Sequence, residues 1–337
     1  MRRKSHFRAV AALLVLLLGT IPKTWAAPDA STDRATVVIV VGAAGESEFG
    51  SNFVRQAGLW EKAGKAADCR TITLGLGDAG RTNDCEQLRQ TLEAEPKAGR
   101  GELWLVLIGH GTFDGKEAKF NLRGPDLPAT NLALWLKPIQ RPLAVINTAS
   151  SSAPFLNQLS ATNRVIITAT RSGNEQNYTR FGQFLSESIA DPHADLDKDG
   201  QVSLLEGFLM ASRRVAEFYK LEGRIVTEHA LLDDNGDGLG SSADWFRGVR
   251  AVKSAADGKL VDGVRAHQLN LVRSAVEQEL SPTARLRRDE LEQRLSNLRL
   301  EKSSMNEDDY FNQLEPILLE LARLYSATPT NQPAQPK

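Results

Sequence analysis

Short apolar runs recur through the first half of the chain, and glycine or small polar residues follow most of them. The strands that these runs predict cover residues 37–41, 71–74, 103–108, 143–146 and 165–168. Apolar runs without alternation are typical of strands that are buried on both faces of a sheet. Residues 53–67 and 84–95 carry apolar side chains at helical spacing instead. Strand and helix therefore alternate, which predicts an α/β fold with a mostly parallel sheet covered on both faces.

The pattern continues after the third predicted strand with shorter elements. Residues 112–124 alternate like a hairpin, and residues 131–136 begin a helix that Pro138 ends. Residues 181–189 and 204–219 are amphipathic and predict two further helices. The second of these carries an apolar stripe of Phe208, Ala211, Val215 and Phe218.

Composition changes near Val264, since glycine is absent after Gly263 and helix-forming residues dominate. We predict a helical appendage over residues 262–326. Its three apolar stripes are Leu269, Val272, Val276 and Leu280, then Leu291, Leu295 and Leu298 in a helix that Ser281 caps, then Tyr310, Leu314, Ile317 and Leu321. Ser304 and Glu307 have the spacing of a capping box for the third helix, and Pro316 predicts a kink in it. Each stripe requires burial, either within the protein or against a partner helix.

The two ends of the chain differ from the rest. Arg2, Arg3, Lys4 and Arg8 precede an apolar run over residues 9–18, and Thr24-Trp25-Ala26 provides a small-x-small cleavage site. The run is shorter than the roughly 20 residues that a membrane span needs, so we predict a cleaved signal peptide over residues 1–26 rather than an anchor. We therefore expect a protein without a membrane span that is exported to the periplasm or secreted. Residues 327–337 are rich in Pro, Gln and Asn, which predicts a disordered tail.

Charge and cysteine content narrow the class of partner and the compartment. The 337 residues carry 41 basic and 42 acidic side chains, and residues 1–26 contain five of the basic ones and none of the acidic ones. The mature chain therefore carries 36 basic and 42 acidic residues, which argues against nucleic acid as a partner. Cys69 and Cys85 are the two cysteines. A disulfide between them suits an oxidising compartment, and two unpaired thiols are the alternative.

Candidate catalytic residues follow the third and fourth predicted strands. His110 lies between two glycines directly after the third strand. The fourth strand is followed by Asn147, Thr148, Ala149 and the serines 150–152. Because catalytic groups gather at the carboxyl ends of parallel strands, we expect His110 to face these residues. Residues 170–173 follow the fifth strand, and they either line the same cleft or form a solvated loop.

In these segments the chain resembles the caspase-like clan of cysteine peptidases, and most closely its legumain-like branch in bacteria. The matching residues are IGHG, which ends at Gly111, and VINTASSSAPF, which ends at Phe155. Over residues 36–255 the resemblance implies a caspase-like three-layer α/β/α fold with His110 in the position of the catalytic histidine. The position of the family's cysteine is taken by Thr148 or Ala149, with Ser150 next, so the resemblance implies a peptidase homologue whose nucleophile is missing. It also implies that His229 and Asp233 lie near the substrate side.

Residues 195–206 match the loop of an EF-hand calcium site. Oxygen ligands stand at positions 1, 3, 5, 7, 9 and 12, supplied by Asp195, Asp197, Asp199, the Gln201 carbonyl, Ser203 and Glu206. Gly200 at position 6 permits the sharp turn that wraps the chain around the ion. Calcium takes six to eight hard oxygen ligands, which is why this spacing predicts a Ca²⁺ site.

Residues 233–244 form a second match to the same loop. The first four ligand positions hold Asp233, Asn235, Asp237 and Leu239, the last of which offers its carbonyl. Asp244 stands where a bidentate glutamate is usual. Because the shorter carboxylate reaches less far, we expect weaker calcium binding or a preference nearer to magnesium. A metal-free turn is the alternative.

Three functions remain open from the sequence. The first is an exported, calcium-binding peptidase homologue without its nucleophile, which acts by binding a peptide or protein. The second is a hydrolase that uses His110 as general base and Thr148, Ser150 or Ser151 as nucleophile. The third is a calcium-stabilised scaffold of the cell envelope.

Overall fold

The structure is a computed structural model that describes residues 34–77, 83–254 and 260–326. The predicted signal peptide and the predicted tail over residues 327–337 lie outside these residues. Among the helices of the described ranges, none combines the length and the apolar character that crossing a lipid bilayer requires.

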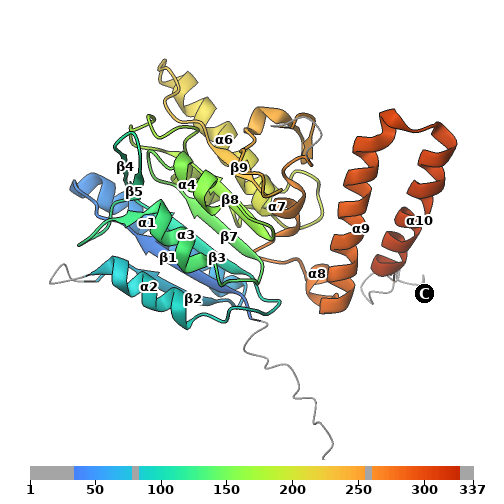
Figure 1. The fold of residues 1–337 in the computed structure, drawn as a ribbon, viewed down its shortest axis with the longest axis horizontal. Helices are drawn as coiled ribbons and strands as arrows, with labels where there is room; N and C mark the ends of the chain where they lie inside the picture. The colour runs from blue at the N-terminus through green and yellow to red at the C-terminus, as the bar shows by residue number, and fades with distance from the viewer. Residues whose placement is uncertain (1–33, 78–82, 255–259, 327–337) are drawn as a thin grey trace, which may run out of the picture.

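Six strands form the central sheet, in the order β2-β1-β3-β7-β8-β9 (Figure 1). In chain order they are β1 (Thr36–Val41), β2 (Arg70–Leu74), β3 (Leu103–Ile108), β7 (Leu143–Asn147), β8 (Arg164–Thr168) and β9 (Leu231–Asp233). The first five run parallel, and β9 pairs antiparallel with β8 at one edge. The predicted α/β fold with a mostly parallel sheet is therefore confirmed. The sequence pattern does not predict β9, because its last residue, Asp233, is also the first residue of the second loop motif.

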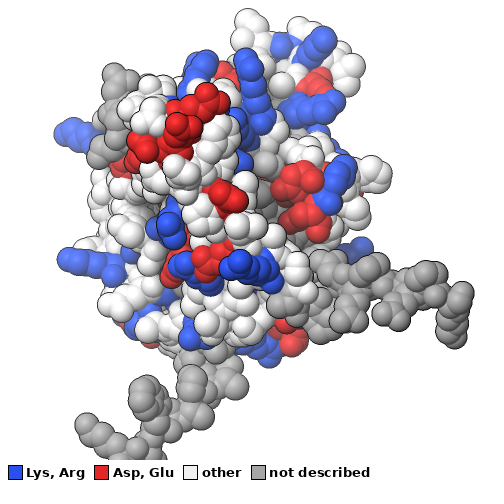
Figure 2. All heavy atoms as spheres, turned by 90° about the vertical axis from the view of Figure 1, so that its right-hand side faces the viewer, with Lys and Arg blue, Asp and Glu red and all other residues white. Residues whose placement is uncertain are grey.

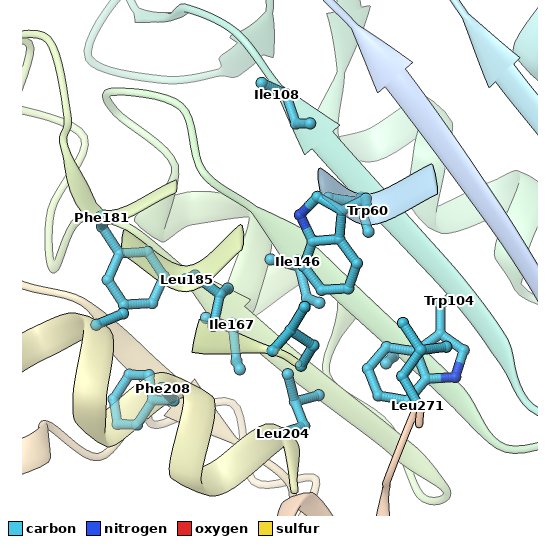
Figure 3. Close-up of a cluster of buried hydrophobic side chains, with 14 of the residues drawn as sticks. Trp60, Trp104, Ile108, Ile146, Ile167, Phe181, Leu185, Leu204, Phe208 and Leu271 are labelled. Carbon is cyan, nitrogen blue, oxygen red and sulfur yellow. The ribbon is translucent and has the colours of Figure 1, made fainter. Parts of the chain in front are cut away.

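One face of the sheet is covered by α1 (Ser47–Ala66), α5 (Phe181–Ser188) and α6 (Leu204–Leu221). Figure 3 shows side chains of the buried cluster on this face, which includes Trp60 from α1, Ile146 from β7 and Phe208 from α6. All three of these side chains are fully buried. The predicted stripe on residues 204–219 is thus the face with which α6 packs onto the sheet.

The opposite face is covered by α2 (Asp84–Ala94), α3 (Ala129–Leu136) and α4 (Ala153–Leu159). Successive side chains of a strand point to opposite faces, so Val106 packs with the first set of helices and Leu105 with the second. The central strands therefore contain continuous apolar runs because both of their faces are covered.

Shorter elements occupy the connections. A second, antiparallel sheet consists of β4 (Gly111–Phe113), β5 (Ala118–Phe120) and β6 (Leu127–Pro128), and it contains the predicted hairpin. The remaining short elements are η2 (Pro192–Ala194), η3 (Ala243–Trp245), β10 (Phe246–Arg247) and β11 (Arg250–Ala251).

The single helix predicted with Leu269, Val272, Val276 and Leu280 on one stripe is wrong. Two short helices, α7 (Val264–Gln268) and α8 (Ala275–Glu279), take its place. Between them the backbone of Asn270 forms a bridge with Ser203, and the Leu204 amide donates to the Leu269 carbonyl over 2.8 Å. Because the backbone pairs with the loop ahead of α6, these residues need no helix to satisfy their polar groups.

The last two long helices form a hairpin beside the sheet domain (Figure 1). α9 (Pro282–Glu301) and α10 (Glu307–Ser326) are joined through η4 (Lys302–Ser304), and their apolar stripes meet in a small cluster of their own. Figure 2 views this side of the molecule, where basic and acidic side chains are interspersed, and Arg287 of α9 pairs with Glu320 of α10 at 2.6 Å. The predicted cap at Ser304 is wrong, because Asn306 Oδ1 accepts the Asp309 amide instead.

Cys69 and Cys85 are free thiols, which is the second of the two alternatives that the sequence left open. Cys69 immediately precedes β2, whereas Cys85 lies in the first turn of the helix that follows β2. The two cysteines therefore flank opposite ends of a strand of five residues, which spans about 16 Å. Burial raises the pKa of the Cys69 thiol to about 11.

Candidate functional site

β3 and β7 are neighbours in the sheet, and the loops that follow them meet. The Gly111 amide donates to Ser150 Oγ over 3.2 Å, and Ser150 Oγ donates to the Gly111 carbonyl over 3.1 Å. Position 111 has no room for a side chain, because a Cβ there would lie 2.3 Å from the Ser150 carbonyl oxygen and 3.4 Å from Ala149 Cβ. The structure thus brings residues 109–111, the histidine loop, directly against the turn at residues 149–150.

His110 lies among aromatic rings at this junction. Its imidazole centroid is 5.0 Å from the ring of Phe49, 5.1 Å from that of Phe53 and 6.1 Å from that of Tyr178. Its Nε2 is 3.2 Å from the Ala44 carbonyl oxygen. A carbonyl only accepts hydrogen bonds, so this contact requires a proton on Nε2 and leaves Nδ1 as the basic nitrogen. The imidazole remains partly exposed.

The residues at the predicted nucleophile position direct their polar atoms into the backbone. Thr148 Oγ1 donates to the Leu107 carbonyl over 2.9 Å, and Ser150 Oγ donates to Gly111. Ala149 is 1% exposed and carries a methyl group, which is no nucleophile. A hydroxyl has one proton to donate, so neither Thr148 nor Ser150 offers its proton to an imidazole in this arrangement.

Ser151 differs from its neighbours in the turn. Its φ of 54° lies in the left-handed region, and its side chain is 1% exposed. Its Oγ is buried and has no hydrogen-bond partner in the described residues. The hydroxyl of the next serine does have partners, because Ser152 Oγ accepts the amides of Ala169 and Thr170.

The loop after β8 packs around this turn. Thr170 is buried and contacts Ser152 through its Oγ1 at 3.2 Å, whereas Arg171 is exposed. Glu175 connects three segments: its carbonyl accepts the Ser151 amide over 2.8 Å, and its Oε1 lies 2.6 Å from Nδ1 of His229. Sequence reasoning missed Glu175, because its partner His229 is 54 residues away and no motif links them.

His229 also borders a cavity of about 600 Å³ between α6 and the segments around β9. The cavity is lined mainly by apolar side chains, including Leu209, Val226 and Phe246. Glu228 lies at this cavity but is 3% exposed, and it accepts the amides of Arg180 and Phe181 at the start of α5. Burial raises the pKa of Glu228 above its ordinary value. Glu228 is a second residue without a sequence signal, since the amides that it accepts lie 47 and 48 residues away in the chain.

The loop over residues 195–206 gathers its carboxylates. Oxygen atoms of Asp195, Asp197 and Asp199 lie within 4.8 Å of one another, and theirs is the one such acidic, His or Cys group found in the described ranges. Glu206 folds back over the loop: its Oε1 accepts the Leu196 amide over 2.7 Å, and its Oε2 accepts Ser203 Oγ over 2.9 Å. These hard oxygens suit a divalent cation such as calcium.

Gln201 and Asp197 of this loop contact the segment after residue 260. The side-chain oxygen of Gln201 accepts the Ser274 amide over 3.1 Å, so the backbone carbonyl of Gln201, which is the predicted ligand atom, is not used by this contact. His267 Nε2 lies 2.8 Å from Asp197 Oδ2, and this hydrogen bond lowers the pKa of Asp197. His267 is another residue that sequence reasoning missed.

The loop over residues 233–244 has the same curled backbone at its start. Asp233 Oδ1 accepts the Gly236 amide over 3.0 Å, and Asn235 Oδ1 accepts the Asp237 amide over 2.8 Å. Leu239 is exposed, and its amide donates to Asp237 Oδ1. The structure does not bring Asp244 into this pattern, since Asp244 is exposed and its carboxylate accepts the hydroxyl of Ser242.

Comparisons with known proteins give solved structures but no sequence family. No protein-family model and no curated protein sequence matches the chain. It is similar to the structure of the Drosophila initiator caspase Dronc, with 12% identity and a TM-score of 0.40 over 60% of this chain and 80% of that one. It is also similar to caspase-1 from Spodoptera frugiperda, with 11% identity and a TM-score of 0.37 over 60% of this chain and 87% of that one. Likenesses of this size do not carry an activity from one chain to another.

Proposed function

We propose that the chain is an exported, calcium-binding relative of the legumain-like peptidases that lacks a nucleophile and acts by binding a peptide or protein. The observation that carries this proposal is Ala149, a methyl group held against Gly111 at the turn that meets the histidine loop. Ala149 offers His110 no thiol or hydroxyl, and the hydroxyls of Thr148 and Ser150 already donate to backbone carbonyls, so none of these three residues supports covalent catalysis in this arrangement. The export signal over residues 1–26 supports a periplasmic or secreted location.

The ligand-binding surface in this proposal is the rim around His110. The rings of Phe49 and Tyr178 are partly exposed beside the imidazole and suit apolar and planar groups of a peptide, whereas Phe53 supports the imidazole from within the core. The imidazole adds one polar atom to this rim, since its Nδ1 is not used by the contact with Ala44. A retained binding surface with a vacated nucleophile is what an inactive peptidase homologue requires.

Calcium in this proposal binds first at the loop over residues 195–206. The donor set supports it, because three carboxylates converge and Glu206 closes the loop from the first turn of α6. When bound, the cation would neutralise the mutual repulsion of these carboxylates and tie the start of α6 to the loop.

A peptide-hydrolysis assay tests the missing nucleophile. Purified mature chain is expected to leave Asn- and Asp-containing peptides uncut, and His110→Ala is expected to change nothing. Hydrolysis that disappears in His110→Ala would overturn the proposal. Binding is measured separately, by fluorescence anisotropy of a labelled peptide library, where the proposal expects retained binding by wild type and weaker binding by Phe49→Ala.

One observation favours a second candidate, a serine hydrolase that uses Ser151. Its left-handed backbone and unpartnered buried Oγ are features that cluster at functional sites. A fluorophosphonate probe distinguishes the candidates: an adduct on Ser151 that is absent in Ser151→Ala supports the hydrolase. The third candidate, an envelope scaffold, is favoured if calcium raises the unfolding temperature while no peptide binds at the His110 rim.

A further inference from the structure

The two predicted calcium loops share one backbone hydrogen-bond pattern. In each, the carboxylate at position 1 accepts the amides at positions 4 and 6: Asp195 from Lys198 at 2.6 Å and Gly200 at 3.1 Å, and Asp233 from Gly236 at 3.0 Å and Gly238 at 3.1 Å. Residues at positions 4 and 6 have positive φ in both loops. The two segments are therefore folded alike over their first six positions.

Glu206 closes the first loop in a defined way. One carboxylate oxygen accepts the amides of Leu196 at 2.7 Å and Asp197 at 3.3 Å, which are positions 2 and 3. The other oxygen accepts the hydroxyl of Ser203, which is position 9, at 2.9 Å. The carboxylate thus lies across the opening of the loop.

Asp262 makes the corresponding contacts in the second loop. Its Oδ1 accepts the amides of Asp234 at 3.0 Å and Asn235 at 3.3 Å, again positions 2 and 3. Its Oδ2 accepts the hydroxyl of Ser241, again position 9, at 2.6 Å. Asp262 is 2% exposed, whereas Asp244, the residue at position 12 of the motif, is exposed. The shorter aspartate can make these contacts because it comes from another segment and not from the end of the loop.

The second loop also contains a buried polar atom without a hydrogen-bond partner among the described residues. Asp237 Oδ2 is buried and has no hydrogen-bond partner among the described residues, while its Oδ1 accepts the Leu239 amide. A buried carboxylate oxygen without a partner is costly, and position 5 is a cation ligand in loops of this kind. A bound cation would satisfy this atom.

We propose that Asp262, and not Asp244, is the acidic ligand that closes a divalent-cation site at the second loop. The other ligands are Asp233, Asn235, Asp237 and the carbonyl of Leu239. This inference rests on the calcium binding proposed above and adds a ligand that lies outside the twelve-residue motif. Glu206 and Asp262 stand in the same relation to their loops, since each accepts the amides at positions 2 and 3 and the hydroxyl at position 9.

In this proposal the second cation stabilises the position of the segment after residue 260 against the second loop. Asp234, next to the first ligand, accepts the amides of Gly263 at 2.9 Å and Ala266 at 2.8 Å at the start of α7. Asn235 Nδ2 donates to the Leu260 carbonyl over 2.7 Å. The same segment leads through α8 to the helical hairpin, so a cation held by Asp262 ties this connection to the edge strand β9.

Calcium titration of the mature chain by calorimetry tests the assignment. Asp195→Asn and Asp197→Asn together remove calcium binding at the first loop and define the silenced background. The calcium affinity of the second loop is then measured in this background with and without Asp262→Asn. Because a carboxylate ligand is lost, we expect the calcium affinity of that site to fall at least about tenfold. Asp244→Asn is the matched control and is expected to leave the affinity unchanged.

Hydrogen exchange keeps the assignment testable if Asp262→Asn does not fold. In the silenced background, calcium is expected to slow amide exchange in residues 260–268 together with residues 233–241. Protection of residues 233–241 alone, or a loss of affinity in Asp244→Asn but not in Asp262→Asn, overturns the inference. If wild type binds calcium but the silenced background does not, the assignment of Asp262 is overturned and calcium binding at the first loop stands. If wild type binds no calcium, the proposed calcium binding itself is overturned.

Discussion

The turn after β7 and the loop before α6 are both short polar segments, but their polar atoms point in different directions. In the turn, the hydroxyls of Thr148 and Ser150 donate to backbone carbonyls. In the loop, the carboxylates of Asp195, Asp197 and Asp199 converge on one another within 4.8 Å. The hydroxyls of Thr148 and Ser150 therefore need no ligand, whereas the carboxylates of the loop place like charges together, which a bound cation would relieve.

Under the function proposed above, this difference separates a turn that contributes packing from a loop that binds a ligand. The turn keeps the histidine loop in place through Gly111 and Ser150, although Ala149 brings no reactive atom. The loop keeps the oxygen atoms that the proposed calcium site requires, and Glu206 contacts it from the first turn of α6. We therefore expect ligand-dependent effects at the loop and ligand-independent packing effects at the turn.

The largest expected effect is on calcium binding at the first loop. Glu206→Gln removes one negative ligand, so we expect the calcium affinity of this loop to fall by about 100-fold. At saturating calcium this corresponds to a loss of about 2.7 kcal/mol of cation-dependent stability. Calorimetry measures the affinity, and thermal unfolding with calcium and with chelator measures the stability. Equal calcium-induced shifts in wild type and variant would remove Glu206 from the ligand set.

A somewhat smaller effect is expected at the contact between the turn and the histidine loop. Gly111→Ala places a Cβ 2.3 Å from the Ser150 carbonyl oxygen, and such overpacking costs about 2 kcal/mol. Gly58 in α1 is the matched control, because a Cβ there has nothing within 4 Å. Gly58→Ala is expected to raise the free energy of unfolding by about 0.5–1 kcal/mol. Urea unfolding measures both, and equal effects of the two changes would contradict the close contact.

A gain in stability is expected at Ser151. Ser151→Gly relieves the left-handed backbone and removes an unpartnered buried hydroxyl, so we expect the free energy of unfolding to rise by about 1 kcal/mol. Ser150→Ala is the comparison in the same turn and is expected to cost about 1 kcal/mol, since it breaks the hydrogen bonds with Gly111. Chemical unfolding of both variants, in chelator, measures the difference. Destabilisation by both changes would show that Ser151 Oγ has a partner.

The smallest expected effect is a pH dependence that comes from Glu228. Burial raises the folded-state pKa of Glu228 above its ordinary value of 4.5, so its contribution to stability is fully present below about pH 4.5 and is lost as the pH rises through the raised value. Glu228→Gln removes this contribution. Between pH 4.5 and pH 7, wild type should therefore lose more stability than the variant, and parallel stability curves would contradict the assignment.

Local patterns determined much of what the structure contains. The apolar runs of β1, β3 and β7 marked buried strands because both faces of these strands are covered by helices. The Asp and Gly spacing of residues 195–206 marked a tightly curled loop, because the first-position carboxylate must reach the amides three and five residues ahead. The stripes of α9 and α10 were also readable, since each recurs every three to four residues.

Tertiary structure decided the contacts between segments that are distant in the chain. The break between α7 and α8 follows from pairing of Asn270 with Ser203, and no helical propensity forecasts it. Cys69 and Cys85 stay unpaired because β2 lies between their positions, although sixteen residues of sequence allow a loop to close. Asp262 reaches the second loop from beyond the motif. A sequence pattern specifies which side chains a segment offers, but only the packed fold specifies which distant atoms can reach them, because that depends on the positions of other segments.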